Sequence, residues 1–279
     1  MAVTIKDVAA LAGVSPSTVS RTCKNNPSIS TETKEKVIVT GGTRGLGLGM
    51  AEGFLQAGCK VAIVGTSDKV FAVAEAECKK GYDCVGVKGD LSKREDVYRI
   101  FNECVEKLGG DLDVLVTSHG IQRRHSAEEF PLNEWDDVIS VNLSSIFVLC
   151  QEAGKIMLKK GYGKIINVAS MNSFFGGQTI PAYAAAKGGV AQLTKELSND
   201  WAGRGINVNA IAPGYMATEM NEALLDPKNP RFKIISERIP AGRWGTGEDM
   251  QGTAIFLASH ASDYLCGAVI PVDGGYLVK

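Results

Sequence analysis

Short apolar runs rich in β-branched residues alternate with amphipathic stretches from Val37 to the end of the chain. Seven runs have the uniformly apolar character of buried parallel strands, and they cover residues 37–41, 60–65, 83–89, 113–119, 164–169, 206–212 and 268–272. Between two of them, apolar residues fall on one stripe of a helix: Val97, Ile100, Phe101, Cys104, Val105 and Leu108. The alternation predicts an α/β fold with a doubly wound, seven-stranded parallel sheet.

The first 36 residues follow a different pattern. Apolar positions at helical spacing mark a first short helix: Ile5, Val8, Ala9 and Ala12. Gly13 then allows a turn, and Ser15 followed by Pro16 supplies the N-cap and first residue of a second helix. This order is typical of a helix-turn-helix. We therefore expect two domains, a short all-helical segment over residues 1–36 and an α/β domain over residues 37–279.

The stretch from Thr218 to about Pro240 has no clear strand or helix period, and its middle reads D-P-K-N-P. Long irregular segments are uncommon in compact domains and often cover ligand sites. We expect an irregular substrate lid here.

The amino-acid composition argues against several classes of function. The 30 Lys and Arg residues balance 31 Asp and Glu residues, so the net charge of −1 attracts neither nucleic acid nor an anionic membrane as a whole. The start lacks the features of a signal peptide, and no apolar run approaches the roughly 18 residues of a membrane span. The seven cysteines are scattered without metal-ligand spacing, at positions 23, 59, 78, 84, 104, 150 and 266. We expect a cytoplasmic protein with buried thiols, no metal and no membrane contact.

The chain reads T-G-x-x-x-G-x-G from Thr40 to Gly47, between the first strand and the helix that follows it. Glycines at these places permit a tight turn and let backbone N–H groups approach a pyrophosphate. A purely structural strand-to-helix turn is the alternative, but the strand before and the helix after favour dinucleotide binding in a Rossmann fold.

Candidate catalytic groups follow the fifth strand. Tyr183 and Lys187 are four residues apart and therefore share one face of a helix. Ser170 ends the strand, at the carboxyl edge where doubly wound sheets bind ligands. Taken singly, they could equally be a core tyrosine, a surface lysine and a helix cap.

Together with Asn142 in V-N-L and the pair Pro213-Gly214, these motifs resemble the classical short-chain dehydrogenase/reductase family over residues 37–279. The runs IINVASMNSF and INVNAIAPGYMAT resemble its sugar-acid branch, the gluconate and deoxy-ketogluconate dehydrogenases. The resemblance implies hydride transfer between a nicotinamide and a secondary alcohol of a sugar acid, in a homotetramer. It assigns catalysis to Asn142, Ser170, Tyr183 and Lys187.

The chemistry requires a base for the hydroxyl proton, and Tyr183 fits that role. Because the ordinary pKa of tyrosine is about 10, work near neutral pH needs a depression of roughly 2 to 3 units, which we expect from the cation of Lys187 and the oxidised nicotinamide. Ser170 would bind the reacting oxygen. By resemblance, Asn142 would hold a water that connects Lys187 to solvent.

By resemblance, Asp90 would contact the adenine amino group and Thr218 the nicotinamide carboxamide. The other residues expected at the dinucleotide are Gly41, Thr43, Arg44, Gly45, Leu46, Gly47, Thr66, Leu91, Tyr183, Lys187, Pro213 and Gly214. The second strand ends without the acid that usually binds the ribose of NAD. Arg44 and Thr66 therefore favour NADP(H), whereas the branch favours NAD(H), and the choice stays open.

After the fourth strand, Thr117-Ser118-His119-Gly120 replaces the N-N-A-G typical of the family. No carboxylate or nucleophile stands at a motif spacing from His119, so we interpret it as a loop histidine without a role. Arg123 and Arg124 follow. They either clamp a substrate carboxylate near Ser170 and Tyr183 or form a solvated basic turn.

Residues 4 to about 37 resemble the helix-turn-helix headpiece of the LacI family of repressors, which implies DNA contacts by Ser17, Thr18 and Arg21. The third helix is short, the hinge helix is missing, and residues 1–36 carry five basic and three acidic residues, a net charge of only +2. DNA binding is therefore not favoured over a vestigial or mis-started extension.

Two other functions stay open. The chain could be a transcription regulator whose dehydrogenase-like domain senses redox state or a sugar acid. It could also be a general ketoreductase, such as a 3-oxoacyl-thioester reductase.

Overall fold

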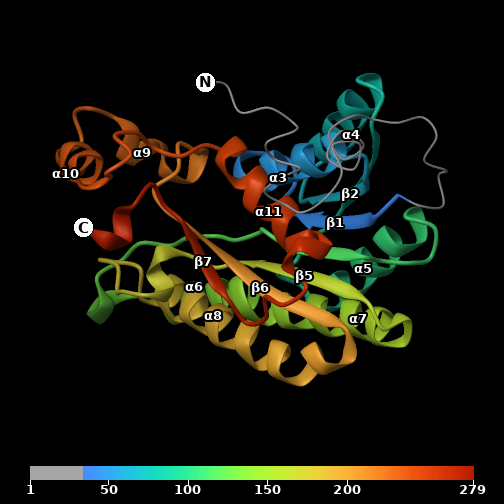
Figure 1. Ribbon diagram of the computed structural model, residues 1–279. Helices are drawn as coiled ribbons and strands as arrows, with labels where there is room; N and C mark the ends of the chain where they lie inside the picture. The colour runs from blue at the N-terminus through green and yellow to red at the C-terminus, as the bar shows by residue number, and fades with distance from the viewer. Residues whose placement is uncertain (1–33) are drawn as a thin grey trace.

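Seven parallel strands form the central sheet of the computed structural model, which describes residues 34–279 (Figure 1). The strands are β1 Lys36–Thr40, β2 Lys60–Gly65, β3 Asp83–Lys88, β4 Val114–Thr117, β5 Gly163–Val168, β6 Ile206–Pro213 and β7 Val269–Val272. Their order is β3-β2-β1-β4-β5-β6-β7, so the direction of winding reverses between β1 and β4. The predicted doubly wound sheet is confirmed, although the edge strand β7 is half-exposed rather than buried. Ligands of such sheets bind at the carboxyl edge beside this reversal.

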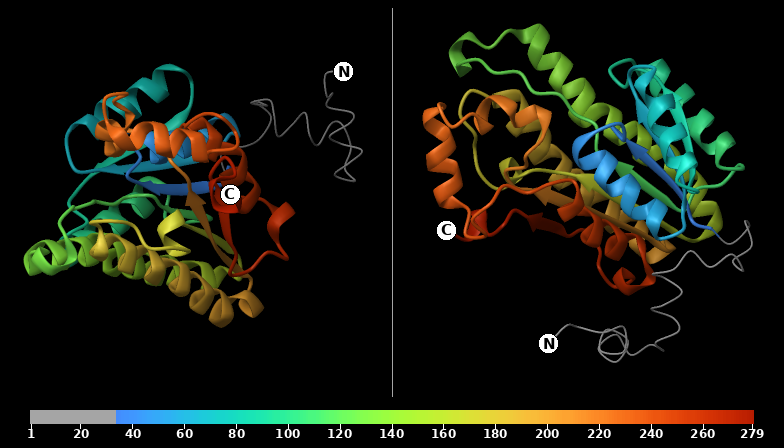
Figure 2. Two further views of the ribbon diagram at one scale, coloured as in Figure 1. Left: turned by 90° about the vertical axis from the view of Figure 1, so that its left-hand side faces the viewer. Right: turned by 90° about the horizontal axis from the view of Figure 1, so that it is seen from above.

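Helices cover both faces of the sheet (Figures 1 and 2). One face carries α3 Gly45–Gln56, α4 Lys69–Lys79 and α11 Gln251–Ala258. The other carries α5 Arg94–Lys107, α7 Ser145–Lys160 and α8 Pro181–Trp201, with α6 Leu132–Ile139 beside α8. The predicted stripe of α5 is confirmed, since all its members pack in the core and only Val105 is partly exposed.

The expectation that residues 218–240 are irregular is wrong, because this segment, called the lid below, contains α9 Glu222–Leu225 and α10 Pro230–Arg238. The side chain of Asn229 accepts a hydrogen bond from the N–H of Arg231, and Pro230 occupies the first turn of α10. The sequence D-P-K-N-P thus contains a helix start as well as a loop. Both helices overhang the carboxyl edge of the sheet, close to the C-terminus (Figure 1).

The cysteines in the described part of the chain are all free thiols. Cys59, Cys84, Cys104 and Cys150 are buried as expected, but Cys78 and Cys266 are exposed, so the expectation of buried thiols is wrong for these two. Cys23 lies outside the described residues. Among residues 34–279, no helix combines the length and the apolar character needed to cross a bilayer.

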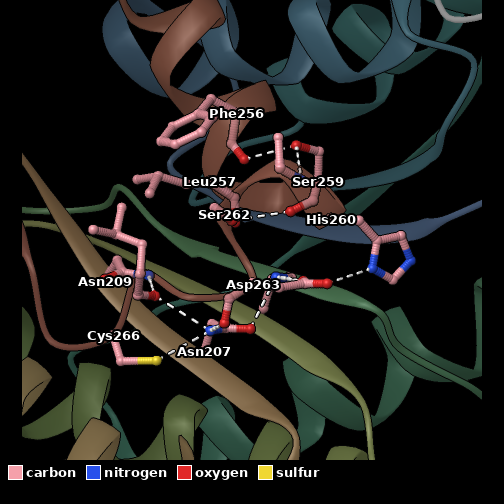
Figure 3. Close-up of polar contacts among 12 residues, drawn as sticks. Asn207, Asn209, Phe256, Leu257, Ser259, His260, Ser262, Asp263 and Cys266 are labelled. Carbon is pink, nitrogen blue, oxygen red and sulfur yellow. Dashed lines mark hydrogen bonds and ion pairs between the residues drawn. The ribbon is translucent and has the colours of Figure 1, made fainter. Parts of the chain in front are cut away.

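A polar network closes the amino end of the sheet (Figure 3). Asn207 donates to the carbonyl of Asp263 at 2.9 Å, and Asn209 donates to the carbonyl of Leu265 at 2.8 Å. The buried ammonium of Lys164 donates to Asn207 at 2.9 Å and to the Asp263 carboxylate at 2.6 Å. These bonds anchor the segment between α11 and β7 to β6, at the end of the sheet opposite the lid.

Candidate active site

A cavity of about 920 Å³ opens at the carboxyl ends of β1 to β4, between the glycine loop and the start of the lid. Twelve residues expected at the dinucleotide or the substrate line it: Gly41, Thr43, Arg44, Gly45, Leu46, Gly47, Thr66, Asp90, Leu91, Arg123, Arg124 and Thr218. Pro213, Gly214 and the four expected catalytic residues are not among its lining residues. The volume and position suit an extended ligand laid across the winding reversal.

Two glycines give the loop after β1 its shape. Gly41 has a φ of 66°, a backbone conformation that glycine adopts without strain. A Cβ on Gly47 would lie only 2.2 Å from the carbonyl oxygen of Gly41, so a side chain cannot fit there. The loop leads directly into α3, whose first turn holds no acidic residue. The loop therefore fits the anionic pyrophosphate of a dinucleotide.

Arg44 is paired with the carboxylate of Glu219, which begins the lid. Both side chains are exposed, so the pair is weak and open to competition from an anion. Thr66 lines the cavity at the end of β2, and nearby Asp68 is paired with Lys88 at 3.0 Å. Asp90 already accepts hydrogen bonds from the backbone N–H and hydroxyl of Ser92.

Ser170, Tyr183 and Lys187 come together where β5 and α8 meet. The ammonium of Lys187 lies 5.9 Å from the centroid of the Tyr183 ring and donates to the carbonyl of Val168 at 2.6 Å. The hydroxyl of Ser170 lies close enough to Tyr183 to lower the pKa of the phenol. The Ser170 hydroxyl accepts from the N–H of Asn172 at 3.1 Å and caps a short 3₁₀ turn.

The electrostatics of this group differ from the expectation. Burial raises the pKa of Tyr183, while the bond with Ser170 and the charge of Arg124 lower it. Burial also lowers the pKa of Lys187 to about 8. In the protein without a dinucleotide, the effect of burial on the pKa of Tyr183 thus exceeds the two effects that lower it.

Asn142 lies in a π-helical turn, Ser140–Ser144, between α6 and α7. It is buried, and its amide both accepts from the N–H and donates to the carbonyl of Ile121, each at 2.8 Å. Turns of this kind interrupt α-helices frequently at functional sites. Asn142 is therefore firmly positioned behind the cavity, beside the loop that follows β4.

The two arginines after β4 are both exposed and both line the cavity, but their charged neighbours differ. Arg123 is exposed and lies 3.7 Å from Glu134. Arg124 is close enough to Tyr183 for the charge of each to shift the pKa of the other. Burial and the charge of Arg231 in the lid lower the pKa of Arg124. Of the two arginines, Arg124 is the one whose charge acts on Tyr183.

Sequence reasoning missed several residues of this site. Glu219 and Arg231 come from the lid and reach Arg44 and Arg124 across more than a hundred residues of chain, which no local spacing signals. The interpretation of His119 as a loop histidine without a role is also incomplete, because its side chain is buried between two hydroxyl groups. The departure from N-N-A-G at residues 117–120 was the feature of the sequence that could have indicated a role for His119.

Comparisons with known proteins found similar chains. The family described as enoyl-(acyl carrier protein) reductase matches residues 41–277. The chain is similar to 2-dehydro-3-deoxy-D-gluconate 5-dehydrogenase of Bacillus subtilis, with 44% identity over 87% of this chain and 94% of that protein. The crystal structure of a gluconate 5-dehydrogenase from Burkholderia cenocepacia, in complex with NADP and tartrate, is 37% identical, with a TM-score of 0.83 over 88% of this chain and 96% of that one.

The chain belongs to the short-chain dehydrogenase/reductase family. As a member of that family it is a short-chain NAD(P)-dependent dehydrogenase. A second family, the bacterial regulatory proteins of the lacI family, matches residues 4–39. This match overlaps β1, which begins at Lys36 in the middle of the sheet. The expected DNA contacts Ser17, Thr18 and Arg21 lie outside the described residues.

Proposed function

We propose that this short-chain dehydrogenase interconverts a secondary alcohol and a ketone on a sugar acid with NADP(H) or NAD(H). The observation that carries the proposal is that Arg124 lines the cavity and lies within electrostatic range of Tyr183, the candidate base. A carboxylate held by a guanidinium through two hydrogen bonds would fix a sugar acid with one hydroxyl at the phenol. The curated relative from Bacillus subtilis acts, by its name, on such an acid.

The proposed reaction uses the residues gathered at the end of β5. Tyr183 accepts the hydroxyl proton of the alcohol while Ser170 donates a hydrogen bond to the same oxygen. The dinucleotide supplies the acceptor for the hydride that leaves the carbon. Lys187, whose lowered pKa lets it exchange protons near pH 8, stabilises the phenolate when charged. Asn142 would hold a water through which the proton returns to solvent.

The glycine loop and α3 would hold the pyrophosphate, Asp90 and Leu91 the adenine end, and Pro213, Gly214 and Thr218 the nicotinamide end. We favour NADP(H) over NAD(H), because Arg44 and Thr66 line the cavity where no acid opposes a 2'-phosphate. NADP is bound in three of the similar solved structures. We also propose self-association into a homotetramer, supported by the exposed Phe147 on α7 and Phe256 on α11.

The matching family is described as enoyl-(acyl carrier protein) reductase, so an acyl thioester is an alternative substrate that the experiment must include. The experiment therefore follows nicotinamide absorbance with gluconate, 2-deoxygluconate, 3-deoxy-keto sugar acids and an acetoacetyl thioester, each with NADP or NAD in the matching redox state. We expect turnover of a sugar acid. Turnover of the thioester alone would replace the proposal with the ketoreductase.

A matched pair of variants tests the carboxylate contact. Arg124→Ala should raise KM for the sugar acid about tenfold to a hundredfold, since a charge-assisted bidentate contact is lost. Arg123→Ala should leave KM within about twofold, because Arg123 faces Glu134 and solvent. Equal effects of the two substitutions would contradict the assignment of Arg124.

DNA binding is a second candidate function, favoured by the lacI-family match over residues 4–39. In that case the dehydrogenase domain would act as the sensor of a regulator. Full-length protein would then retain palindromic DNA in a salt-sensitive manner, and protein lacking residues 1–33 would not. Equal retention of random DNA by both proteins would exclude a specific headpiece.

A further inference from the structure

His119 connects the two halves of the candidate active site. Its Nδ1 lies 2.7 Å from the hydroxyl of Thr40, the last residue of β1, and its Nε2 lies 2.7 Å from the hydroxyl of Ser145, the first residue of α7. All three side chains are buried. One imidazole thus bridges the start of the glycine loop and the end of the π-helical turn that holds Asn142.

The surrounding hydrogen bonds assign the proton of the ring. Ser145 donates its hydroxyl to the carbonyl of Val141 at 2.7 Å, so it accepts from Nε2–H of His119. Nδ1 is then an acceptor, and the hydroxyl of Thr40 donates a hydrogen bond to it. The oxygen of that hydroxyl accepts from the N–H of Ser118 at 3.1 Å. The competing bond from Thr40 to the carbonyl of Val116 is longer, at 3.2 Å. Each donor and acceptor is used once, and the ring is neutral.

Burial and the charge of Lys187 lower the pKa of His119 to about 3, in agreement with a permanently neutral ring. A group that stays neutral throughout the working pH range cannot exchange protons with a substrate. The rigid, fully satisfied arrangement fits a group that fixes the position of others.

At the Thr40 end, the bridge supports the glycine loop. Gly41 follows Thr40 directly, and a Cβ on Gly41 would lie 3.0 Å from the Cα and backbone nitrogen of His119. The loop expected to hold the pyrophosphate therefore rests on the backbone of residue 119. Movement of His119 changes the loop and, with it, the affinity for the dinucleotide.

At the Ser145 end, the bridge supports the turn of Asn142. Ser145 is bonded to Val141, the neighbour of Asn142, and the Asn142 amide is paired with Ile121, two residues after His119. A Cβ on Gly120 would lie 3.3 Å from Oδ1 of Asn142. Movement at this end therefore reaches the group expected in proton return and not the dinucleotide loop.

We infer that His119 is a positioning residue whose two ring nitrogens separately hold the dinucleotide loop, through Thr40, and the Asn142 turn, through Ser145. The inference rests on the proposed function for its effect on turnover but not for its effect on dinucleotide binding. It also accounts for this chain's departure from N-N-A-G at Thr117-Ser118-His119-Gly120.

Two substitutions separate the two ends, because the Asn oxygen can replace Nδ1 as an acceptor and the Gln nitrogen can replace Nε2–H as a donor. His119→Asn should keep Kd for the dinucleotide within about twofold and lower kcat about tenfold. His119→Gln should weaken dinucleotide binding about tenfold with kcat at saturation within about twofold. Thr40→Val and Ser145→Ala should reproduce the Gln and Asn patterns, respectively.

Dinucleotide Kd is measured by calorimetry without a sugar acid, kcat at saturating concentrations of both substrates, and folding by thermal melting. Parallel changes of Kd and kcat in His119→Asn and His119→Gln, or no change in either, would overturn the inference. If one of them fails to fold, Thr40→Val and Ser145→Ala provide the test. The inference requires that Thr40→Val change mainly Kd and that Ser145→Ala change mainly kcat. Wild-type protein that binds dinucleotide but oxidises no sugar acid contradicts the proposed function instead, and the Kd comparison still tests the Thr40 end.

Discussion

Each end of the sheet has a buried lysine and a tyrosine close together in the sequence. At the amino end they lie in β5 and directly before it, and at the carboxyl end both lie in α8. The surroundings of the two pairs are opposite. At the amino end, Lys164 is paired with Asp263 and Asn207, and carboxylates surround Tyr162 and raise its pKa further than burial does alone. At the carboxyl end, Lys187 has one carbonyl partner. Burial raises the pKa of Tyr183, but the nearby hydroxyl of Ser170 and the charge of Arg124 act in the opposite direction. The same residue types therefore form a structural anchor at one end and, at the other, a candidate base whose charged and polar neighbours favour its ionised form.

The two phenols give the largest expected contrast. Tyr183→Phe should lower kcat by about a thousandfold, because the group that accepts the substrate proton is removed, while Kd for the dinucleotide stays within about twofold. Tyr162→Phe should leave kcat unchanged, since its buried hydroxyl has no hydrogen-bond partner within residues 34–279. Steady-state kinetics and calorimetry check both, and full activity of Tyr183→Phe would remove the proposed base.

The two buried lysines should have opposite effects on stability. The shift of the Lys187 pKa from 10.5 to about 8 corresponds to about 3 kcal/mol, which folding loses by burying this group near neutral pH. Lys187→Met should therefore raise the free energy of unfolding by about 2 to 3 kcal/mol at pH 7 while lowering kcat at least tenfold. Lys164→Met should lower it by about 2 kcal/mol with kcat unchanged, because two hydrogen bonds are lost.

The pH dependence identifies the cause of that difference. Between pH 8 and 10.5 the folded protein binds fewer protons at Lys187 than the unfolded chain, so the stability of the wild type rises with pH in this window. Lys187→Met should lack this rise, and the two proteins should converge toward pH 10.5 in urea titrations. Parallel pH curves for the two proteins would show that Lys187 is not the group responsible.

A smaller contrast concerns two carboxylates of the lid. Glu219→Gln should lower Kd for NADP(H) about threefold and Kd for NAD(H) less, because Arg44 loses its partner and becomes free for a 2'-phosphate. Glu222→Gln is the control, since Glu222 lines the same cavity but is not paired with Arg44. If both substitutions change the two affinities equally, only the general charge of the lid matters.

The strands, the helix stripe and the glycine loop could be predicted because each depends on residues close together in the sequence. The pairing of Arg44 with Glu219 and the approach of Arg231 to Arg124 could not, since both depend on how the lid folds over the cavity. The rise of the Tyr183 pKa in the protein without a dinucleotide could not be predicted either, because spacing on a helix says nothing about burial. His119 shows that a departure from a family motif can identify an interaction whose partners the motif does not contain.

The smallest expected effect comes from removing residues 1–33, which belong to neither of the two residue pairs compared above. The sheet is already anchored at its start, since Lys60 donates to the carbonyl of Glu35 at 2.9 Å and the N–H of Lys36 donates to Asp113 at 2.8 Å. These bonds remain in a chain that begins at Lys34, so kcat should stay within about twofold and Tm within about 2 °C of the full chain. Calorimetry and kinetics on the two proteins check this, and extending the deletion through Lys36 is the positive control, because it removes both bonds and shortens β1. A large loss of Tm on removing residues 1–33 alone would show that the segment similar to the lacI family packs on the dehydrogenase domain, so the two would then fold as one unit.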